Sequence, residues 1–519
     1  MFRRHAMHEE RPPRLARGMW KRFLVAIPLI VVLTAAATAT AGLEKLTTFA
    51  QEALPKSSHI TTARGLVLPA YDGEPQTFLL IGSDKRAASR DQFDRLDPPH
   101  SDSMLLVHLD PNQGQTSVLS LPRDLLVSIY DPQTGQTSYP EKLNAAYTIG
   151  SYDHGSSDPA ATLAAYTIEK LTGIKLNGII DVTFGGFIDV VDQLGCVYVN
   201  VDHFYDNPPA LSNIDGYSEI YLQPGYQKLC YNNALSYVRY RHDDSDFVRV
   251  ARQQDFIRAV REQANINLGN IDSVLKSVGD AMRTTFSPSA SELEILAKLL
   301  LFSQQKPLRQ VPFEFSNDDY QLGNPPVDYV TASQQDIQST VQDFLYGNQK
   351  VSLHQATNAI AAATSSGRHH EFSPAAIGLF PTPSSGQASL VNQGSSIPFR
   401  VLYPRLQTGP AQQVDTRAYT IKDRSGVRHQ AYVVVFQENT DGGYYDVEAM
   451  NWNDPPLITN PSRTASIDGR HYIFVDDGSH IHVIAWHEHG ALYWVNNTLL
   501  EDLTNAQMIG IANSVQPLG

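Results

Sequence analysis

The 519-residue sequence contains only two cysteines and fewer basic than acidic residues, with 40 lysines and arginines against 54 aspartates and glutamates. At a formal net charge of −14, the chain lacks the broad basic face that nucleic-acid phosphates demand, so general nucleic-acid binding is excluded. Long apolar runs are also scarce. The apolar run at residues 23–41 has no cysteine directly after it, which excludes anchoring as a lipoprotein.

Basic residues concentrate at the N-terminus. Residues 1–22 contain seven arginines and lysines against two glutamates, a charge of +5, which leaves −19 on the rest of the chain. Residues 23–41 are 19 uncharged positions, close to the roughly 20 that a helix needs to cross about 30 Å of hydrocarbon. The positive flank predicts a cytoplasmic tail at 1–22, a transmembrane helix at 23–41 and the remainder outside, as a single-pass protein of the cytoplasmic membrane. A cleaved signal peptide is the alternative, because Ala37-Thr38-Ala39 and Ala39-Thr40-Ala41 resemble cleavage sites.

The length allows two folded domains and connecting segments. We interpret residues 42–71 as a short stalk. Between 76 and 202, strand-like runs alternate with helical stretches, which is typical of an α/β domain with a central sheet. Residues 348–395 are rich in alanine, serine, glycine, proline and threonine and predict an interdomain linker. Residues 396–519 predict a smaller α+β module, an antiparallel sheet packed by a helix.

Turn residues and periodicity also place individual elements. The turn cluster Asp110-Pro111-Asn112-Gln113-Gly114 predicts a hairpin over 104–121. In the first domain we further expect strands at 77–82, 179–184 and 197–201, and helices at 159–172, 185–194, 232–240, 248–266 and 334–346. In the second module we expect strands at 429–436, 444–450, 471–475, 480–486 and 491–496, and a helix at about 499–514.

Polar groups follow or precede the apolar runs of the first domain. The stretches are IGSDKR at 81–86, HSDSMLLVHLDP at 100–111, LPRD at 121–124, KLNAAY at 142–147, and YVRYRH with DFVRVARQQDF within 237–256. Asp84 ends the first strand, Asp102 precedes the second, and Arg123 follows the third. Because ligands gather where strands end in open α/β sheets, we expect these side chains to converge.

Carboxylates beside arginines indicate a divalent cation, Mg²⁺ or Mn²⁺, that bridges to a polyanion. Phosphoryl transfer needs such neutralisation, and planar guanidinium groups hold phosphate oxygens in pairs. Arg239 and Arg241 are two residues apart, while Arg249 and Gln253 are four apart and share a helix face. For any single arginine, a solvated or salt-bridged side chain is the alternative, since Asp243 and its acidic neighbours lie beside Arg241.

Taken in order, these motifs resemble the LytR-CpsA-Psr family of cell-wall glycopolymer ligases over about 72–265. The resemblance implies a catalytic domain at 72–347 with a central mixed sheet flanked by helices and an apolar tunnel for a polyprenyl tail. It implies a metal site at Asp84 and Asp102, with Asp84, Arg123, Arg239 and Arg241 as catalytic residues. The pyrophosphate-binding residues that it implies are Arg86, Arg123, Arg239, Arg241, Arg249 and Gln253.

The activity implied by the resemblance is that of a Mg²⁺-dependent phosphotransferase. It would transfer a phosphate-linked glycopolymer from a polyprenyl-pyrophosphate carrier to a peptidoglycan hydroxyl, with the catalytic domain outside the cytoplasmic membrane. Two other functions stay open. One is a surface polyprenyl-pyrophosphate hydrolase, in which water replaces the sugar hydroxyl, and the other is a non-catalytic, membrane-anchored regulator of envelope function.

Several positions depart from the family pattern. His100 stands where many members have arginine, and Ser103 replaces a threonine. Cys196 and Cys230 fall in the part predicted to lie outside, where a disulfide is permitted, although two buried free thiols are an alternative. Since both replace glycine-containing family segments, the resemblance favours a disulfide between them.

Histidines are conspicuous near the C-terminus. His480 and His482 share one face of a predicted strand, because side chains alternate along a strand. A metal site is conceivable there, but a solvent-facing polar strand is the favoured interpretation.

Overall fold

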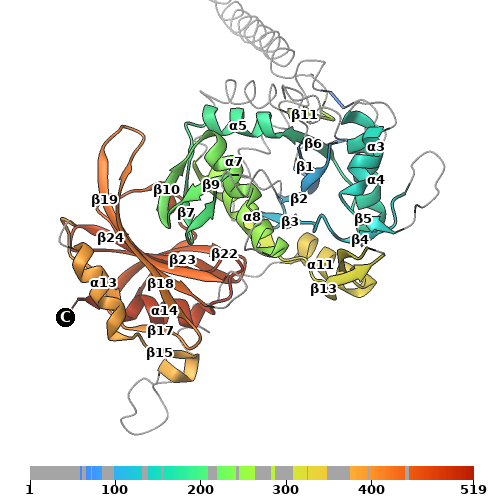
Figure 1. Ribbon diagram of the computed structural model, residues 1–519. Helices are drawn as coiled ribbons and strands as arrows, with labels where there is room; N and C mark the ends of the chain where they lie inside the picture. Colours follow the sequence, from blue (N-terminus) through green and yellow to red (C-terminus); the bar gives the residue numbers. More distant parts are fainter. Residues whose placement is uncertain are drawn as a thin grey trace, which may run out of the picture.

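The computed structural model describes residues 59–60, 66–71, 73–84, 99–130, 138, 140–152, 157–208, 219–240, 245–263, 282–286, 308–323, 325–347, 374–394, 397–438 and 443–518 (Figure 1). Two folded parts lie side by side, a mixed α/β domain followed by a β-rich C-terminal module, as the fold-class prediction has it.

A six-stranded mixed sheet forms the centre of the first domain, in the order β11-β6-β1-β2-β3-β12. Its strands are β1 (Gln76–Ser83), β2 (Ser101–Asp110), β3 (Gln115–Ser120), β6 (Gly178–Thr183), β11 (Met282–Thr284) and β12 (Leu308–Val311). Strand β1 pairs antiparallel with β2 and parallel with β6. Strands β2 and β3 form the hairpin predicted from the turn cluster.

Apolar side chains alternate between the two faces of this sheet, as expected for strands. Leu79, Ile81, Leu106 and their neighbours face a large buried core under the helices α3 (Ala145–Tyr152), α4 (Ser157–Thr172) and α11 (Gln334–Tyr346). The opposite face has a smaller cluster of Leu105, Val118 and Leu308. Ser333 caps the N-terminus of helix α11 and forms a reciprocal capping box with Asp336.

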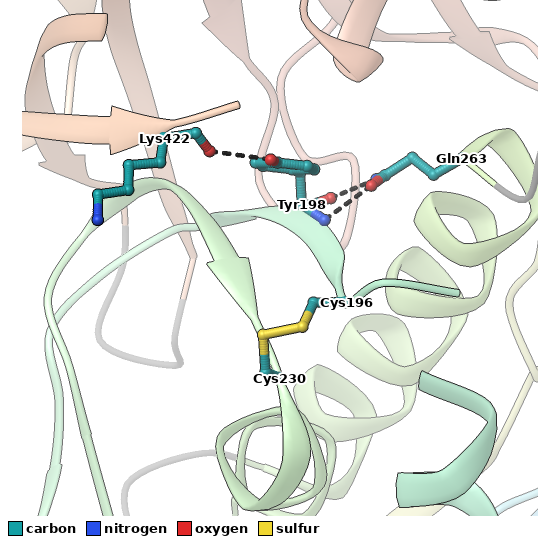
Figure 2. The surroundings of a disulfide bond; sticks show 5 residues. All are labelled: Cys196, Tyr198, Cys230, Gln263 and Lys422. Carbon is teal, nitrogen blue, oxygen red and sulfur yellow. Dashed lines mark hydrogen bonds between the residues drawn. A yellow bond between two sulfur atoms is a disulfide. The ribbon is translucent and has the colours of Figure 1, made fainter. Parts of the chain in front are cut away.

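A second layer extends from the sheet toward the C-terminal module (Figure 1). It contains α5 (Phe184–Gln193), β7 (Val197–Val201), β8 (Tyr205–Asn207), β9 (Ile220–Leu222), β10 (Gly225–Leu229), α7 (Tyr231–Arg239) and α8 (Asp246–Gln263). A disulfide joins Cys196, directly before β7, to Cys230, the N-cap of α7, with Cα atoms 4.8 Å apart (Figure 2). The predicted pairing is confirmed, and the alternative of two free thiols is wrong.

Short pairs complete the first domain. They are β4 (Leu126–Val127) with β5 (Glu141–Lys142), and β13 (Asn317–Leu322) with β14 (Val327–Thr331). Every residue of β13 is exposed, whereas β14 buries Tyr329 and Val330, and Val330 belongs to the main core of the domain. Only β13 therefore projects from the domain.

The C-terminal module is a seven-stranded antiparallel sheet in the order β18-β19-β20-β24-β23-β22-β21. Its strands are β18 (Gln412–Lys422), β19 (Arg428–Gln437), β20 (Tyr444–Met450), β21 (Arg463–Ile467), β22 (Arg470–Asp477), β23 (His480–Glu488) and β24 (Ala491–Asn496). One face packs against α14 (Asn505–Ser514), which starts six residues later than predicted. Smaller elements are η3 (Pro456–Ile458), β16 (Leu402–Pro404), β17 (Leu406–Thr408) and β25 (Val515–Pro517).

Part of the predicted linker belongs to this module. Residues 374–394 form η2 (Pro374–Ile377), β15 (Leu379–Pro381) and α13 (Ser384–Gly394). Leu379 and Leu390 are buried in the core of the module. These two apolar side chains hold the segment on the module, although its composition is typical of a linker. Residues 348–373 lie outside the described residues. The end of the predicted stalk also packs onto the first domain, because Ile60 is buried and its amide donates to the Thr284 carbonyl.

The predicted localisation needs correction. Within the described part of the chain, no helix has the length and apolar character needed to cross a membrane. Residues 1–22 and the predicted transmembrane helix at 23–41 lie outside that part. We therefore withdraw the assignment as a single-pass membrane protein with an internal N-terminus.

The two parts of the chain meet across a buried polar interface. Tyr198 of β7 donates from its hydroxyl to the Lys422 carbonyl at the end of β18, and its main chain is held on both sides by the Gln263 side chain of α8 (Figure 2). Arg258 of α8 lies 2.6 Å from Asp477 of β22, and each side chain is only 3% exposed. The C-terminal module is thus docked on α8 and β7.

His482 adds a further charge to this interface. Its Nε2 lies 3.1 Å from Asp255 of α8 and its Nδ1 lies 2.6 Å from Glu501. The interpretation of His482 as part of a solvent-facing strand is wrong, because two carboxylates enclose the ring. Burial and the Arg258 charge oppose protonation, yet Glu501 and Asp255 outweigh them and raise the pKa of His482 to about 10.

This pKa predicts how the stability of the interface depends on pH. Because the folded-state pKa lies above the ordinary value of 6.5, protonated His482 stabilises the fold fully below about pH 6.5, and this contribution is lost as pH rises through about 10. We expect the parent chain to have a larger free energy of unfolding than the His482→Asn variant at about pH 6. This difference should become smaller at about pH 10. Denaturant titrations at both pH values measure it, and a difference that stays constant contradicts the assignment.

Candidate active site

The site lies where β1 ends and β2 begins. Asp84 follows β1 directly, and its Oδ1 accepts a hydrogen bond of 2.6 Å from the amide of His100, whose Nδ1 lies 3.7 Å from Oδ2. Burial favours the neutral carboxyl group, but the hydrogen bonds and charge of His100, together with the Arg239 charge, outweigh it and lower the pKa of Asp84. Asp84 is therefore an ionised carboxylate at neutral pH.

Asp102 holds two of the predicted arginines in one place. Its Oδ1 accepts a hydrogen bond of 2.9 Å from Nη1 of Arg123, and its Oδ2 lies 4.0 Å from Nε of Arg239. The three side chains are only 15–24% exposed, so they are held in position and still reach the surface. The convergence predicted from the strand ends is thus observed for Asp84, Asp102, Arg123 and Arg239.

Arg239 is the last residue of α7, and its position depends on the elements around that helix. Its guanidinium lies over the ring of Phe184, 4.1 Å from the centroid, at the start of α5. The disulfide fixes the other end of α7 at Cys230. The arginine is thus oriented by an aromatic face at one end of the helix and by a covalent crosslink at the other.

Helix α8 carries two further predicted site residues, Arg249 and Gln253, and both are buried. Arg249 is 3% exposed. Gln253 donates from Nε2 to the carbonyl of Val238, at a distance of 3.0 Å, and so supports the last turn of α7. Direct contacts of Arg249 and Gln253 with a pyrophosphate stay predictions. Arg86 and Arg241 lie outside the described residues.

Sequence patterns alone did not reveal three contributors to the site. Asp124 lies 3.4 Å from Nε of Arg123 and 2.8 Å from Nζ of Lys142, so one carboxylate connects two cations. Phe184 supports Arg239, as described above. Both Asp124 and Lys142 fall within the quoted motifs LPRD and KLNAAY, which was the signal that could have identified them.

The carboxylates of Asp84 and Asp102 suit a divalent cation in number and type, but they do not supply its full coordination shell. In the described residues, no three histidine, cysteine, aspartate or glutamate side chains gather closely enough to coordinate a metal. Mg²⁺, however, is often held by one or two carboxylates and completes its octahedral shell with water and substrate phosphates. Asp84 directly follows β1 and Asp102 lies near the start of β2, and the two strands are paired with Ser83 opposite Ser101.

Ionised carboxylates with converging guanidinium groups at the strand ends of a mixed sheet define a site suited to phosphate groups. The model of the LytR_cpsA_psr family matches residues 33–343, more than half of the sequence. The chain belongs to this family.

The curated relatives support the same assignment. Biofilm regulatory protein A of Streptococcus mutans is 31% identical over 237 residues, which cover 45% of this chain and 54% of that protein. The polyisoprenyl-teichoic acid–peptidoglycan teichoic acid transferase TagV of Bacillus subtilis is 31% identical over 188 residues, covering 36% of this chain and 44% of the relative. The chain thus spans about half the length of these relatives.

A crystal structure of B. subtilis TagV is also similar. It covers 53% of this chain and 98% of its own, at 24% sequence identity and a TM-score of 0.41.

Proposed function

We propose that this protein transfers a phosphate-linked glycopolymer from a polyprenyl-pyrophosphate carrier to a hydroxyl group of peptidoglycan. The observation that supports this most directly is the placement of Arg123 and Arg239 on either side of Asp102, with ionised Asp84 nearby. Membership of the family, and the teichoic acid transferase activity named for the relative TagV, agree with such chemistry.

In the proposed reaction, Arg123 and Arg239 exchange their contacts with Asp102 for contacts with pyrophosphate oxygens. An oxygen of the acceptor attacks the phosphorus attached to the glycopolymer and forms a new O–P bond. The bond from that phosphorus to the bridging oxygen breaks, polyprenyl phosphate leaves, and the hydroxyl proton passes to a base or to solvent. The guanidinium groups stabilise the charge that develops on the phosphoryl oxygens.

We further propose that Asp84 and Asp102 hold Mg²⁺, with Mn²⁺ as a substitute. A bound divalent cation would neutralise pyrophosphate charge. The hydrogen bond from the His100 amide orients Asp84, and the ion pair with Arg123 orients Asp102, before any substrate arrives.

For the polyprenyl tail, we propose the second face of the central sheet. Leu80, Val107 and Ile257 are only partly buried there, around a small apolar cluster. An apolar surface of this kind would remove the isoprenoid chain from water.

The experiment is a transfer assay with the full-length chain, a polyprenyl-pyrophosphate-linked glycopolymer, peptidoglycan fragments and Mg²⁺. We expect covalent attachment of the polymer to the fragments and release of polyprenyl monophosphate in equal amounts. A chelator of divalent cations should stop attachment, and added Mg²⁺ or Mn²⁺ should restore it. Release of polyprenyl phosphate together with free polymer, and no attachment, would instead identify a hydrolase and overturn the proposal.

A further inference from the structure

A groove of about 460 Å³ lies beside the candidate active site, and its lining includes Asp124 and Lys142 but none of the residues proposed to contact pyrophosphate. It is bounded by the exposed β13–β14 hairpin, the β4–β5 pair and the start of α8. The residues that matter for its chemistry are Asp124, Lys142, Phe247, Asp318, Asp328 and Tyr329.

The groove is continuous with the arginine site through one carboxylate. Asp124 lines the groove and lies 3.4 Å from Nε of Arg123, while Nη1 of the same arginine donates to Asp102. A molecule in the groove would therefore approach the pyrophosphate from the side of Arg123 that faces away from Asp102.

The walls of the groove combine carboxylate acceptors with aromatic surface. Asp318 and Asp328 line it from the two strands of the hairpin, and neither side chain has a hydrogen bond or an ion pair within the described residues. Phe247 stacks on Phe315, whose side chain is 39% exposed, with ring centroids 4.1 Å apart. Carboxylates accept hydrogen bonds from sugar hydroxyls, and aromatic surfaces pack against apolar C–H groups, so the groove suits a saccharide.

Charge decides which saccharide fits. Three carboxylates, Asp124, Asp318 and Asp328, face one ammonium group, Lys142, so the groove carries a formal excess of negative charge. A polymer with repeated phosphates would be repelled, because like charges at close range oppose binding. The donor is therefore excluded from the groove, while an acceptor without phosphate is not.

We propose that this groove binds the glycan of the acceptor, a saccharide without phosphate, and presents its hydroxyl group to the pyrophosphate held at Arg123 and Arg239. The assignment rests on the proposed transferase function. It makes Asp318 and Asp328 residues that determine acceptor binding, and both are exposed, so neither side chain takes part in the core of the domain.

The test compares acceptor and donor kinetics in full-length variants. Replacing both carboxylates, Asp318→Asn with Asp328→Asn, should raise the acceptor KM roughly tenfold or more, because charge-assisted hydrogen bonds are lost. The donor KM should not change. Val327→Trp, which fills the groove from an exposed position of β14, should have the same effect. Asp319→Asn is the matched control, because Asp319 is the exposed neighbour of Asp318 and lies outside the groove lining.

A binding measurement separates this inference from the proposed function. A soluble peptidoglycan oligosaccharide is titrated into the parent chain and the variants without donor. Binding that is lost in the double variant, in a chain that transfers nothing, would support the groove while the transferase proposal fails. Transfer with parental acceptor KM in both groove variants, or oligosaccharide binding that neither variant weakens, would overturn the groove assignment alone. A parent chain that neither binds nor transfers would overturn both.

Discussion

Replacing Arg239 with alanine is expected to reduce glycopolymer transfer by a factor on the order of 10² to 10³, since a donor aimed at developing phosphoryl charge is lost. Arg239 ends α7, lies over Phe184, and is 4.0 Å from Asp102, where a pyrophosphate oxygen could take the place of the carboxylate. Its side chain is 24% exposed, so the unfolding free energy should change by less than the several kcal/mol typical of a broken buried ion pair. Initial transfer rates and denaturant titrations give the two values.

Two further variants sharpen this prediction. Arg239→Lys keeps the charge but not the planar fork that holds two phosphate oxygens, so recovery should be partial. Arg428→Ala removes an exposed arginine of the C-terminal module and should leave transfer unchanged. Parental transfer by Arg239→Ala in the presence of Mg²⁺ would refute the site assignment.

Much of the fold was predictable because its elements are governed by local pattern. The helix predicted at 334–346 has those bounds in the structure, since Ser333 supplies its cap and Gly347 follows its last residue. The hairpin over 104–121 followed from its turn residues. The N-terminal part of the module was missed, because Leu379 and Leu390 become anchors only once the distant strands of the C-terminal sheet are in place.

The site was predictable where it depended on strand ends and less so where it depended on packing. Asp84 and Asp102 follow from the apolar runs next to them, and Arg123 from its place after β3. The helical face shared by Arg249 and Gln253 was consistent with substrate contact, yet Gln253 bonds the Val238 carbonyl. A periodicity shows which residues share a face, but the partner of that face depends on the tertiary fold.

The same distinction applies to the C-terminal module, whose sequence gave no indication that it docks through buried charge. Arg258 faces Asp477, and the neighbouring acidic groups Asp255 and Glu501 also favour its protonated form. Asp477 additionally accepts a hydrogen bond of 2.6 Å from the amide of Gln310 in β12. One carboxylate of the module, Asp477, thus contacts both α8 and the edge strand β12 of the central sheet. The same helix α8 also carries Gln253, which bonds the carbonyl of Val238 directly before Arg239.

We therefore expect Arg258→Met to lower the unfolding free energy by about 3–5 kcal/mol, because Asp477 would be left buried with its charge uncompensated. The control is Lys170→Met, which removes an exposed ammonium group in the last turn of α4. Lys170 has no ion pair among the described residues and lies only over the Tyr166 ring, so its loss should cost about 0–1 kcal/mol. Adding Asp477→Asn to Arg258→Met should recover part of the loss, because asparagine can still accept from the Gln310 amide without a buried charge. Denaturant unfolding measures all three variants. If Arg258→Met is no less stable than Lys170→Met, then the charge at this interface is solvated, and docking of the module depends on the ring contacts of Tyr198 in β7 with Trp452 and of Tyr226 in β10 with Trp494.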